Sequence, residues 1–412
     1  MPGRGSPRGS KPSCARRRPG AMADLRVLYV NQTAQVSGAE RSLLTLIAGL
    51  EAEVDPLVAC PEGELSAEVR ALGIEPIPIS GTKASFRLHP LHTGRGLLEI
   101  ARCSLQVRRI VARVGPDLVH ANTTRAALLA LLARSRSGPP TIAHIRDLAP
   151  EGRAADLVLS LIARRADAIV ANSAYVADRF GQARGRVRVI HNPIDLGRFD
   201  PGKADGRAVR AELGIGEDTV VLTVVGHISP IKGQDEAIAI LADLVAAGND
   251  VVLLLVGSVK FASAGTRLDN RAFGERLPLL ASELEVADRV RFLGERTDVP
   301  SLLAATDVLL MPFWREPFGR VAVEAMAMGV PVAASEVGGP AEIVRADVDG
   351  LLLPPRAPGA WSDALERLLP DTGRRRGLGE NAQARAADFG VGAHVAQVLA
   401  LYRELQPAAG FG

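Results

Sequence analysis

The chain has 412 residues, of which 47% are hydrophobic and 23% charged, an ordinary globular composition that excludes disorder, collagen and coiled coil as whole-chain descriptions. The length predicts two domains, and the best apolar run, Val251–Val256, is far too short to span a bilayer. The net charge of +3 conceals a slightly acidic body, since positions 23–412 hold 43 basic and 46 acidic residues; this argues against nucleic acid as a partner, which needs clustered cations.

Residues 1–22 hold six basic residues and no acidic one, among many Gly, Pro and Ser residues. Such a composition cannot bury enough apolar surface to order itself, and the segment lacks the apolar core of a secretory signal. We predict a disordered basic leader, with an organelle-targeting or anionic-surface arm as the alternative. The three cysteines are too few and too scattered for a disulfide framework, which fits a cytoplasmic location.

From residue 25 onward, short β-branched runs alternate with amphipathic stretches, as is typical of parallel α/β layers. We predict an N-terminal Rossmann-like domain over 23–192, with strands at 25–31, 56–60, 76–80, 117–122, 141–146, 167–173 and 186–192. Its predicted helices are 39–52, 64–72, 96–114, 124–135, 154–165 and 174–180. A linker over 193–205 follows, because Pro193–Pro201 holds two prolines and shows no periodicity.

The same alternation of short β-branched runs and amphipathic stretches begins again in the second half, and we predict a second Rossmann-like domain over 206–390. Its strands are 219–226, 251–257, 289–293, 308–313, 331–335 and 350–353; its helices are 233–247, 271–284, 299–305, 319–328, 339–345 and 360–369, with two more toward the C-terminus. Residues 391–412 are expected to form a helix that packs back on the N-terminal domain. Doubly wound sheets place ligands beyond the carboxyl ends of their strands, so the expected site is the cleft across which the two domains face each other.

Several common site motifs are absent from the sequence. No G-x-G-x-x-G follows a strand and no G-x-x-x-x-G-K-[ST] occurs, so neither a dinucleotide dehydrogenase nor a P-loop NTPase is favoured. The one D-x-D, Asp347–Asp349, precedes Gly350 in a predicted turn and does not end a strand. The sequence therefore predicts no metal site.

The most informative stretch is 315–329 (REPFGRVAVEAMAMG), which directly follows a predicted strand. Pro317 and Gly319 mark a loop that leads into a helix, whose free N–H groups favour anionic or polyhydroxyl ligands. Glu316 lies in this loop, where a catalytic or sugar-binding carboxylate would sit. Glu324 lies among apolar helix residues, and because a lone buried charge is costly it is expected near a cleft or in an ion pair. A loop acid and a surface glutamate are the alternative.

Three further loop-to-helix junctions carry candidate ligand-binding residues. Lys232 at a helix start is unfavourable for the helix dipole unless an anion such as a diphosphate is held there. Gly38 follows the first strand and would let a ligand approach the backbone closely. Gly338 and Gly339 open another helix after a strand. A solvated lysine and plain helix starts are the alternatives.

Together these stretches resemble glycosyltransferase family 4, a retaining group with the two-domain GT-B fold. The resemblance covers essentially residues 25–405, and its specific parts are EPFGRVAVEAMAMG, PVAASEVGGPAEIV and DGLLLPP. It implies a metal-independent retaining glycosyltransferase of the hexosyltransferase type. Such an enzyme moves a sugar from a nucleotide sugar to a hydroxyl of a glycan, a lipid-linked saccharide or a small molecule. The nucleotide sugar is a co-substrate, and no other cofactor is implied.

The resemblance also implies roles for matched positions. Glu316 would hold the sugar of the donor, together with the N–H groups around Phe318 and Gly319. Glu324 would bind the ribose, and Lys232 the diphosphate. The N-terminal domain would receive the acceptor. Cationic and backbone donors would then stabilise the charge that builds on the departing diphosphate.

Four positions depart from the family pattern or qualify it. His227 stands where the family usually has Arg, and a neutral imidazole would stabilise a diphosphate less than a permanent cation. Ser37 replaces the first of two usual glycines, while the second, Gly38, would leave room for diphosphate and sugar. Asn122 stands where many members place a histidine near the reacting sugar. His144 is expected to substitute for that histidine or to line the acceptor side.

The predicted helix 96–114 is basic and amphipathic, with Arg102, Arg109 and Arg113 on one face. Such a helix can lie on anionic lipid or receive a charged acceptor. The family resemblance supports docking through this domain, which would make the protein peripheral on the inner face of the membrane. The solvated outer face of an ordinary helix is the alternative.

Two other functions share this fold. A non-catalytic scaffold that binds sugar nucleotides is motivated by His227, Ser37 and Asn122. A sugar-nucleotide epimerase is the third candidate, and the EPFG…EAMA stretch argues against it.

Overall fold

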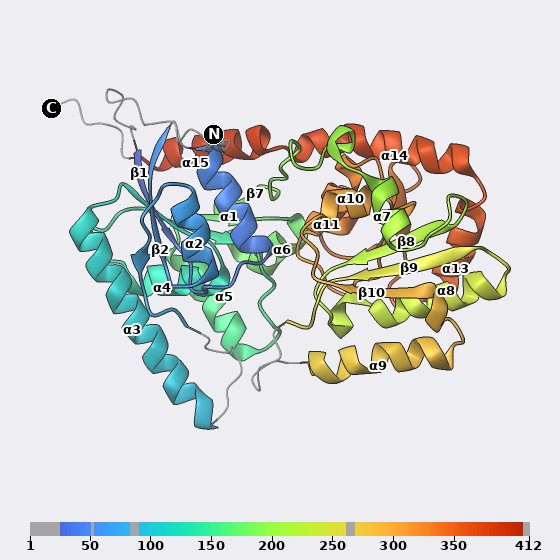
Figure 1. Cartoon of the computed structure of the whole chain (residues 1–412). Coiled ribbons are helices and arrows are strands. Elements are labelled where there is room, and N and C mark those ends of the chain that lie inside the picture. The colour runs from blue at the N-terminus through green and yellow to red at the C-terminus, as the bar shows by residue number, and fades with distance from the viewer. Residues whose placement is uncertain (1–24, 51–52, 83–89, 261–267, 407–412) are drawn as a thin grey trace, which may run out of the picture.

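The structure, a computed structural model, describes residues 25–50, 53–82, 90–260 and 268–406, so the predicted leader lies outside it. Two parallel sheets, of seven and six strands, form two α/β halves that lie side by side (Figure 1). Each sheet separates two apolar cores. Along the first strand, Val27 and Tyr29 pack into one core and Leu28 and Val30 into the other, as the two-residue period of a strand requires. This architecture confirms the predicted pair of Rossmann-like domains.

The N-terminal sheet has the strand order β3-β2-β1-β4-β5-β6-β7, and every neighbouring pair is parallel. Its strands are β1 (Leu25–Val30), β2 (Val54–Cys60), β3 (Ile77–Pro78), β4 (Leu118–Ala121), β5 (Thr141–Ile145), β6 (Ala168–Ala171) and β7 (Val187–Val189). Its helices are α1 (Gly38–Gly49), α2 (Glu64–Ala71), α3 (Pro90–Val114), α4 (Thr124–Ala133), α5 (Arg153–Arg165) and α6 (Ala174–Ala177), followed by a 3-10 helix (Asp178–Arg186).

The C-terminal sheet has the order β10-β9-β8-β11-β12-β13 and is also parallel. Its strands are β8 (Val220–Val225), β9 (Val251–Val256), β10 (Val290–Gly294), β11 (Val308–Met311), β12 (Val332–Ser335) and β13 (Gly350–Leu353). The helices are α7 (Gly206–Glu212), α8 (Gln234–Ala246), α9 (Asn270–Glu283), α10 (Val299–Ala304), α11 (Arg320–Ala327), α12 (Pro340–Ile343), α13 (Pro358–Leu368), α14 (Thr372–Ala386) and α15 (Val391–Leu405).

The strand order reverses between β1 and β4 in one sheet and between β8 and β11 in the other. Connections from the two strands at a reversal leave in opposite directions, so a crevice opens beyond their carboxyl ends. Each domain therefore offers its crevice at the end where a ligand of this fold class binds.

Two helices differ from the sequence-based expectation. Helix α3 begins at Pro90, whereas the predicted helix begins at residue 96. Helix α7 was not predicted, because its seven residues follow the proline-containing linker and are too few for a clear period. Its cap is nevertheless local: the Asp205 carboxylate accepts the N–H of Ala208 at 2.9 Å. None of the described helices is both long and apolar enough to cross a membrane.

The last helix, α15, runs back from the C-terminal half and packs on α1 of the N-terminal domain (Figure 1). Val398, Leu401 and Tyr402 join the apolar core that contains β1. The Tyr402 hydroxyl lies 2.6 Å from His120 Nδ1 and 3.2 Å from the Tyr29 hydroxyl, and all three side chains are fully buried. The two halves of the chain therefore share one core.

A cluster of three buried histidines lies where α15 packs on the N-terminal sheet: His394 belongs to α15, His120 to β4 and His144 to β5. His120 Nε2 is 3.0 Å from His144 Nδ1, and the His144 and His394 rings lie 6.0 Å apart. Burial, and then the nearby charge of Arg146, lowers the pKa of all three histidines, for His394 to about 3. The folded protein therefore holds them neutral at pH 7.

This cluster predicts that acid destabilises the fold. Unfolded histidines titrate near pH 6.5, so below that pH the unfolded state binds more protons and the free energy of unfolding falls. We expect the loss between pH 7 and pH 5 to reach about 2 kcal/mol for each buried histidine. Urea unfolding at pH 7, 6 and 5 measures it. The His394→Asn variant should lose less stability over this range than the wild type; an equal loss would contradict the role of the cluster.

Candidate active site

A cavity of about 1010 Å³ lies between the two domains, at the carboxyl ends of both sheets. The N-terminal domain lines it with residues that follow β1, β2, β5 and β6, and the C-terminal domain with residues that follow β8, β9, β10 and β11. This is the location expected for a ligand of two facing doubly wound sheets.

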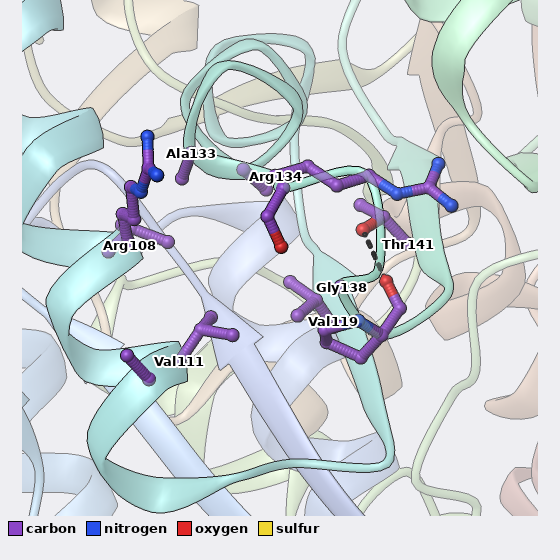
Figure 2. A pocket seen from close by; sticks show the side chains of 12 residues that line it. Arg108, Val111, Val119, Ala133, Arg134, Gly138 and Thr141 are labelled. Atoms are coloured by element: carbon purple, nitrogen blue, oxygen red, sulfur yellow. Dashed lines mark hydrogen bonds between the residues drawn. The ribbon is translucent and has the colours of Figure 1, made fainter.

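A second cavity, of about 230 Å³, lies between α3 and α4 beside the amino end of β5, which begins at Thr141 (Figure 2). Its wall is mainly apolar and includes Val111, Val119 and Ala133, while Arg134 pairs with Asp167 at 3.0 Å. Ligands of parallel α/β sheets bind at the opposite, carboxyl end. The cavity between the domains is therefore the candidate active site.

A largely buried ion pair joins Lys232 and Glu316 on the C-terminal wall of this cavity. Lys232 ends a 3-10 turn after β8, and Glu316 lies in the loop after β11. Only 14% of the lysine side chain and 13% of the glutamate side chain are exposed. The Lys232 ammonium also lies 4.1 Å from the centre of the Phe313 ring. Two residues that are far apart in sequence thus form one ion pair at the cavity wall.

His227 lines the same wall in the loop after β8. Burial, and then the positive charge of Lys232, lowers the pKa of His227 to about 4. The imidazole is therefore neutral at pH 7, and Lys232 supplies the cationic group of this loop.

The loop that contains Phe318 and Gly319 belongs to the C-terminal domain and, with the start of α11, contacts the N-terminal domain. The buried Phe318 ring stacks on His191 of the N-terminal domain, with 5.7 Å between ring centroids. Arg320, at the start of α11, donates to the Ser42 hydroxyl at 2.9 Å and to a linker carbonyl at 3.0 Å. Its guanidinium also lies 3.3 Å from Glu324. Glu324 is thus in an ion pair and lines the cavity.

Gly38 begins α1 and faces this loop from the N-terminal domain. A Cβ added there would meet only the Arg320 Cδ atom, at an ordinary 3.5 Å. The packing within the protein therefore does not itself require glycine at this position. Ser37, the preceding residue, caps the helix: its hydroxyl and N–H both donate to Glu40, at 2.5 and 3.1 Å.

The structure does not bring His144 or Asn122 into the cavity lining. His144 lies inside β5, is fully buried, and contacts His120 and Arg146. Asn122 is also fully buried and donates to the Asn31 side chain and the Ala39 carbonyl. His144 lies within the buried strand β5 and does not line the cavity, so its catalytic role stays a prediction from the sequence. Asn122 likewise supports the wall without forming it.

Arg146 lines the cavity where sequence reasoning expected His144. It is the first residue after β5, so its side chain reaches past the sheet edge. Its position as the last residue of the predicted strand 141–146, one residue past the observed end of β5, was the available signal.

A carboxylate from the C-terminal domain also spans the domain boundary. Glu342 of α12 accepts the N–H groups of Ala174 and Tyr175 at the start of α6, both at 2.8 Å, and lies 3.4 Å from His191 Nε2. Burial alone would raise the pKa of Glu342, but the hydrogen bonds from His191 and the two amides lower it. The ionised carboxylate therefore satisfies helix N–H groups that would otherwise lack partners.

The predicted D-x-D turn contributes no residue to the cavity lining. Asp349 is fully buried and accepts from the Arg345 backbone and side chain, at 2.6 and 2.5 Å. Asp347 pairs with Arg374 at 2.7 Å. Both carboxylates are thus engaged by arginines within the C-terminal domain.

Two family profiles match the chain. The profile of glycosyl transferases group 1 matches residues 205–385, and that of glycosyltransferase family 4 matches residues 36–198. A D-inositol 3-phosphate glycosyltransferase of Salinispora arenicola is 34% identical over 320 residues, which cover 71% of this chain and 70% of the relative. The enzyme of that name from Actinosynnema mirum is 33% identical, with 72% and 75% covered.

Solved structures are similar over nearly the whole chain. Anabaena Alr3699/HepE in complex with UDP-glucose has a TM-score of 0.79 and 26% identity, with 92% of this chain and all of that chain covered. Sucrose-phosphate synthase of Thermosynechococcus elongatus has a TM-score of 0.77 at 23% identity, with 92% and 99% covered, a likeness of fold.

Two facing Rossmann-like domains with a cavity at their shared cleft define the GT-B class of glycosyltransferases, which confirms the predicted fold. The chain belongs to glycosyltransferase family 4, the group 1 glycosyltransferases. The prediction of a nucleotide-sugar glycosyltransferase is thereby confirmed at the level of the family.

Gly338 holds the Glu316 loop through backbone contacts, which predicts a sharp effect of substitution. Its φ is +73°, and an added Cβ would lie 2.4 Å from the Glu316 carbonyl oxygen, the same oxygen that accepts the Gly339 N–H at 2.9 Å. We expect Gly338→Ala to lower the free energy of unfolding by about 1–3 kcal/mol, because both the φ angle and the contact are strained.

Thermal or urea unfolding measures this loss. Gly359→Ala is the matched control, since a Cβ there meets nothing within 4 Å. Its stability should stay within about 0.5 kcal/mol of the wild type. Equal stabilities of the two variants would show that the loop tolerates displacement.

Proposed function

We propose that this protein transfers a sugar from a UDP-sugar to a hydroxyl acceptor, with retention of anomeric configuration and without a bound metal. The observation that carries the proposal is the largely buried Lys232–Glu316 pair at the cavity between the domains. The choice of UDP rests on the similarity to Anabaena HepE, whose structure contains UDP-glucose. Retention rests on the family resemblance.

The bond changes follow from this assignment. The bond between the anomeric carbon and the diphosphate oxygen breaks, and a bond from that carbon to the acceptor oxygen forms on the same face of the sugar. The acceptor proton passes to the departing diphosphate, which takes the place of a protein base. Negative charge grows on the diphosphate, so a cation fixed beside it stabilises the transition state more than the ground state.

Each wall residue then has a distinct role. Lys232 faces the diphosphate, and its pairing with Glu316 fixes the ammonium before substrate arrives. Glu316 and the backbone around Gly319 orient the sugar, while Glu324 binds the ribose. His227, neutral at pH 7, donates or accepts one hydrogen bond and adds no charge.

Metal independence is supported by how the acidic groups are used. The D-x-D carboxylates are paired with arginines away from the cavity. Among the residues that the structure describes, no three His, Cys, Asp or Glu side chains gather as metal ligands. The charge that a divalent ion would supply is assigned to Lys232. Transfer that persists in EDTA would agree with this assignment, and loss of transfer that Mg²⁺ or Mn²⁺ restores would overturn it.

The role of Lys232 predicts the response to its removal. Lys232→Met should lower kcat for transfer or hydrolysis of UDP-glucose by about 100-fold or more, because the transition state loses its fixed cation. The kcat of Glu316→Gln should fall by a similar order, since the Lys232 ammonium loses the carboxylate that fixes its position. Lys203→Met removes a lysine that is 66% exposed on a 3-10 turn and serves as the control.

The same assay separates the competing functions. If the protein were a scaffold, the wild type would bind UDP-glucose without turnover. This alternative is motivated by His227, which is neutral and adds no positive charge beside the diphosphate. An epimerase would release a changed sugar nucleotide and need no acceptor. Retention is read from the anomeric coupling in the NMR spectrum of the product, and a product of inverted configuration would contradict the proposed stereochemistry.

We also propose that α3 docks on an anionic inner-membrane surface. The helix lies on the outer side of the N-terminal domain, away from the C-terminal half (Figure 1). Its outer face exposes 61% of Leu97, 72% of Leu98 and 53% of Leu105. The exposed arginines of the same helix flank these leucines: Arg95, Arg102, Arg108, Arg109 and Arg113. Leucines between arginines match the interface of an anionic bilayer.

We expect the reversal of two of these positive charges to weaken membrane binding. Arg102→Glu with Arg109→Glu should weaken sedimentation with phosphatidylglycerol vesicles by at least tenfold, because each arginine contributes about 1 kcal/mol near such a surface. Arg376→Glu with Arg403→Glu is the control, with the same change of net charge at exposed positions on α14 and α15. Equal loss in both double variants, or no binding by the wild type, would contradict docking through α3.

A further inference from the structure

Arg146 is a buried cation in the N-terminal wall of the active-site cavity. It follows β5, is 4% exposed, and lines the cavity. Its Nε donates to Asn122 Oδ1 at 2.9 Å, one Nη to Asn192 Oδ1, and the other to His144 Nδ1 at 3.2 Å. These bonds use three of the five N–H donors of a guanidinium. All three acceptors are neutral.

The charge of Arg146 is not balanced by a direct carboxylate partner. Five other cations that line the cavity lie within 4.0 Å of a carboxylate: Lys232, Lys260, Arg296, Arg315 and Arg320. Two more, Arg41 and Arg198, are exposed to solvent. Within the described part of the chain, Arg146 alone among the cavity cations is both buried and without an ion pair. A buried charge without an ion pair costs free energy unless a ligand of opposite charge pairs with it.

The electrostatic surroundings offset the charge of Arg146 only in part, through the buried carboxylate of Glu40, which acts on the pKa of Arg146 more weakly than burial and Arg320 do. Burial, and then the positive charge of Arg320 on the facing wall, lowers the pKa of Arg146 to about 9. The guanidinium remains protonated at pH 7. The guanidinium of Arg320 on the facing wall is paired with Glu324, whereas that of Arg146 is not paired with a carboxylate.

A second buried group beside Arg146 also lacks a partner. Asn172 follows β6, is 1% exposed, and lines the cavity. Its amide nitrogen donates to the Arg146 carbonyl at 3.2 Å, which fixes the orientation of the side chain. Its Oδ1 has no hydrogen-bond partner among the described residues. An amide oxygen held in this way accepts a hydroxyl proton, whereas the guanidinium donates to an anion.

We propose that Arg146 and Asn172 form the acceptor subsite and that the acceptor is a hydroxylated molecule with a compact anionic group, a phosphate or a carboxylate. Arg146 takes the anion through its two remaining N–H donors, and Asn172 takes a hydroxyl. The inference rests on the proposed function, in which the opposite wall holds the donor: Lys232, Glu316 and Glu324 all belong to the C-terminal domain. An acceptor of this kind lies across the cleft from the donor sugar.

The test measures donor and acceptor binding separately in the full-length protein. Calorimetry gives the Kd of UDP, and then, with UDP saturating, the Kd of matched ligands: myo-inositol against inositol 3-phosphate, and glucose against glucose 6-phosphate and glucuronate. We expect the wild type to bind at least one charged ligand about tenfold or more tightly than its neutral partner, as a charge-assisted hydrogen bond provides. Phosphate and carboxylate are distinguished by the two glucose derivatives.

Variants connect the preference to Arg146. Arg146→Gln should abolish the preference for the charged ligand and leave the Kd of UDP within about twofold, while Arg146→Lys should retain part of it. Arg186→Gln is the control, an arginine of the same domain whose guanidinium donates to two backbone carbonyls at the C-terminal end of α5. It should behave as the wild type.

Two results would overturn the inference. In one, the wild type binds no charged ligand better than its neutral partner, which tests the subsite even if Arg146→Gln fails to fold. In the other, Arg146→Gln weakens UDP as much as the charged acceptor, which would place Arg146 with the donor. Failure of the wild type to bind UDP at all would instead contradict the proposed function and is read from the first titration.

Discussion

The hydrogen bond between Tyr402 and His120 joins residues that are 282 positions apart, and the cleft depends on the packing around it. Helix α15 leaves the C-terminal domain and buries Tyr402 in the N-terminal core, so the end of the chain ties the two halves together. Arg320 and Glu342 then add polar contacts across the boundary near the cavity. The domains are thus held by an apolar anchor at one side and by charged contacts at the cleft.

Charge is distributed unequally between the two walls of the cleft. The C-terminal wall presents Lys232 and Arg320, each already paired with a glutamate, so these groups are placed before substrate binds. Such preorganisation costs no reorganisation at the moment of reaction. The N-terminal wall presents Arg146, which is held only by neutral groups. The charged groups of the C-terminal wall are therefore paired before a ligand binds, whereas Arg146 on the N-terminal wall would gain a partner of opposite charge only from a ligand.

The sequence predicted those parts of the structure that depend on local pattern. Continuous apolar strands such as β9, which is buried along its whole length, and the loop around Glu316 both follow from short-range composition. The exchange of Arg146 for His144 at the cavity depends on where β5 ends, and a shift of one or two residues decides which side chain is buried. The contact of Tyr402 with His120 has no local signal, because it depends on how two distant elements dock.

The backbone contact between Gly338 and Glu316 bears on how enzymes of this kind diverge. A wall built from main chain against main chain admits few substitutions, because any added side chain displaces the neighbouring strand-end loop. The opposite wall includes exposed side chains such as Arg41 and Glu68, where substitutions usually cost little stability. New acceptors can therefore arise, in nature or in a directed-evolution library, by changes in the N-terminal half while the machinery for the donor is inherited intact.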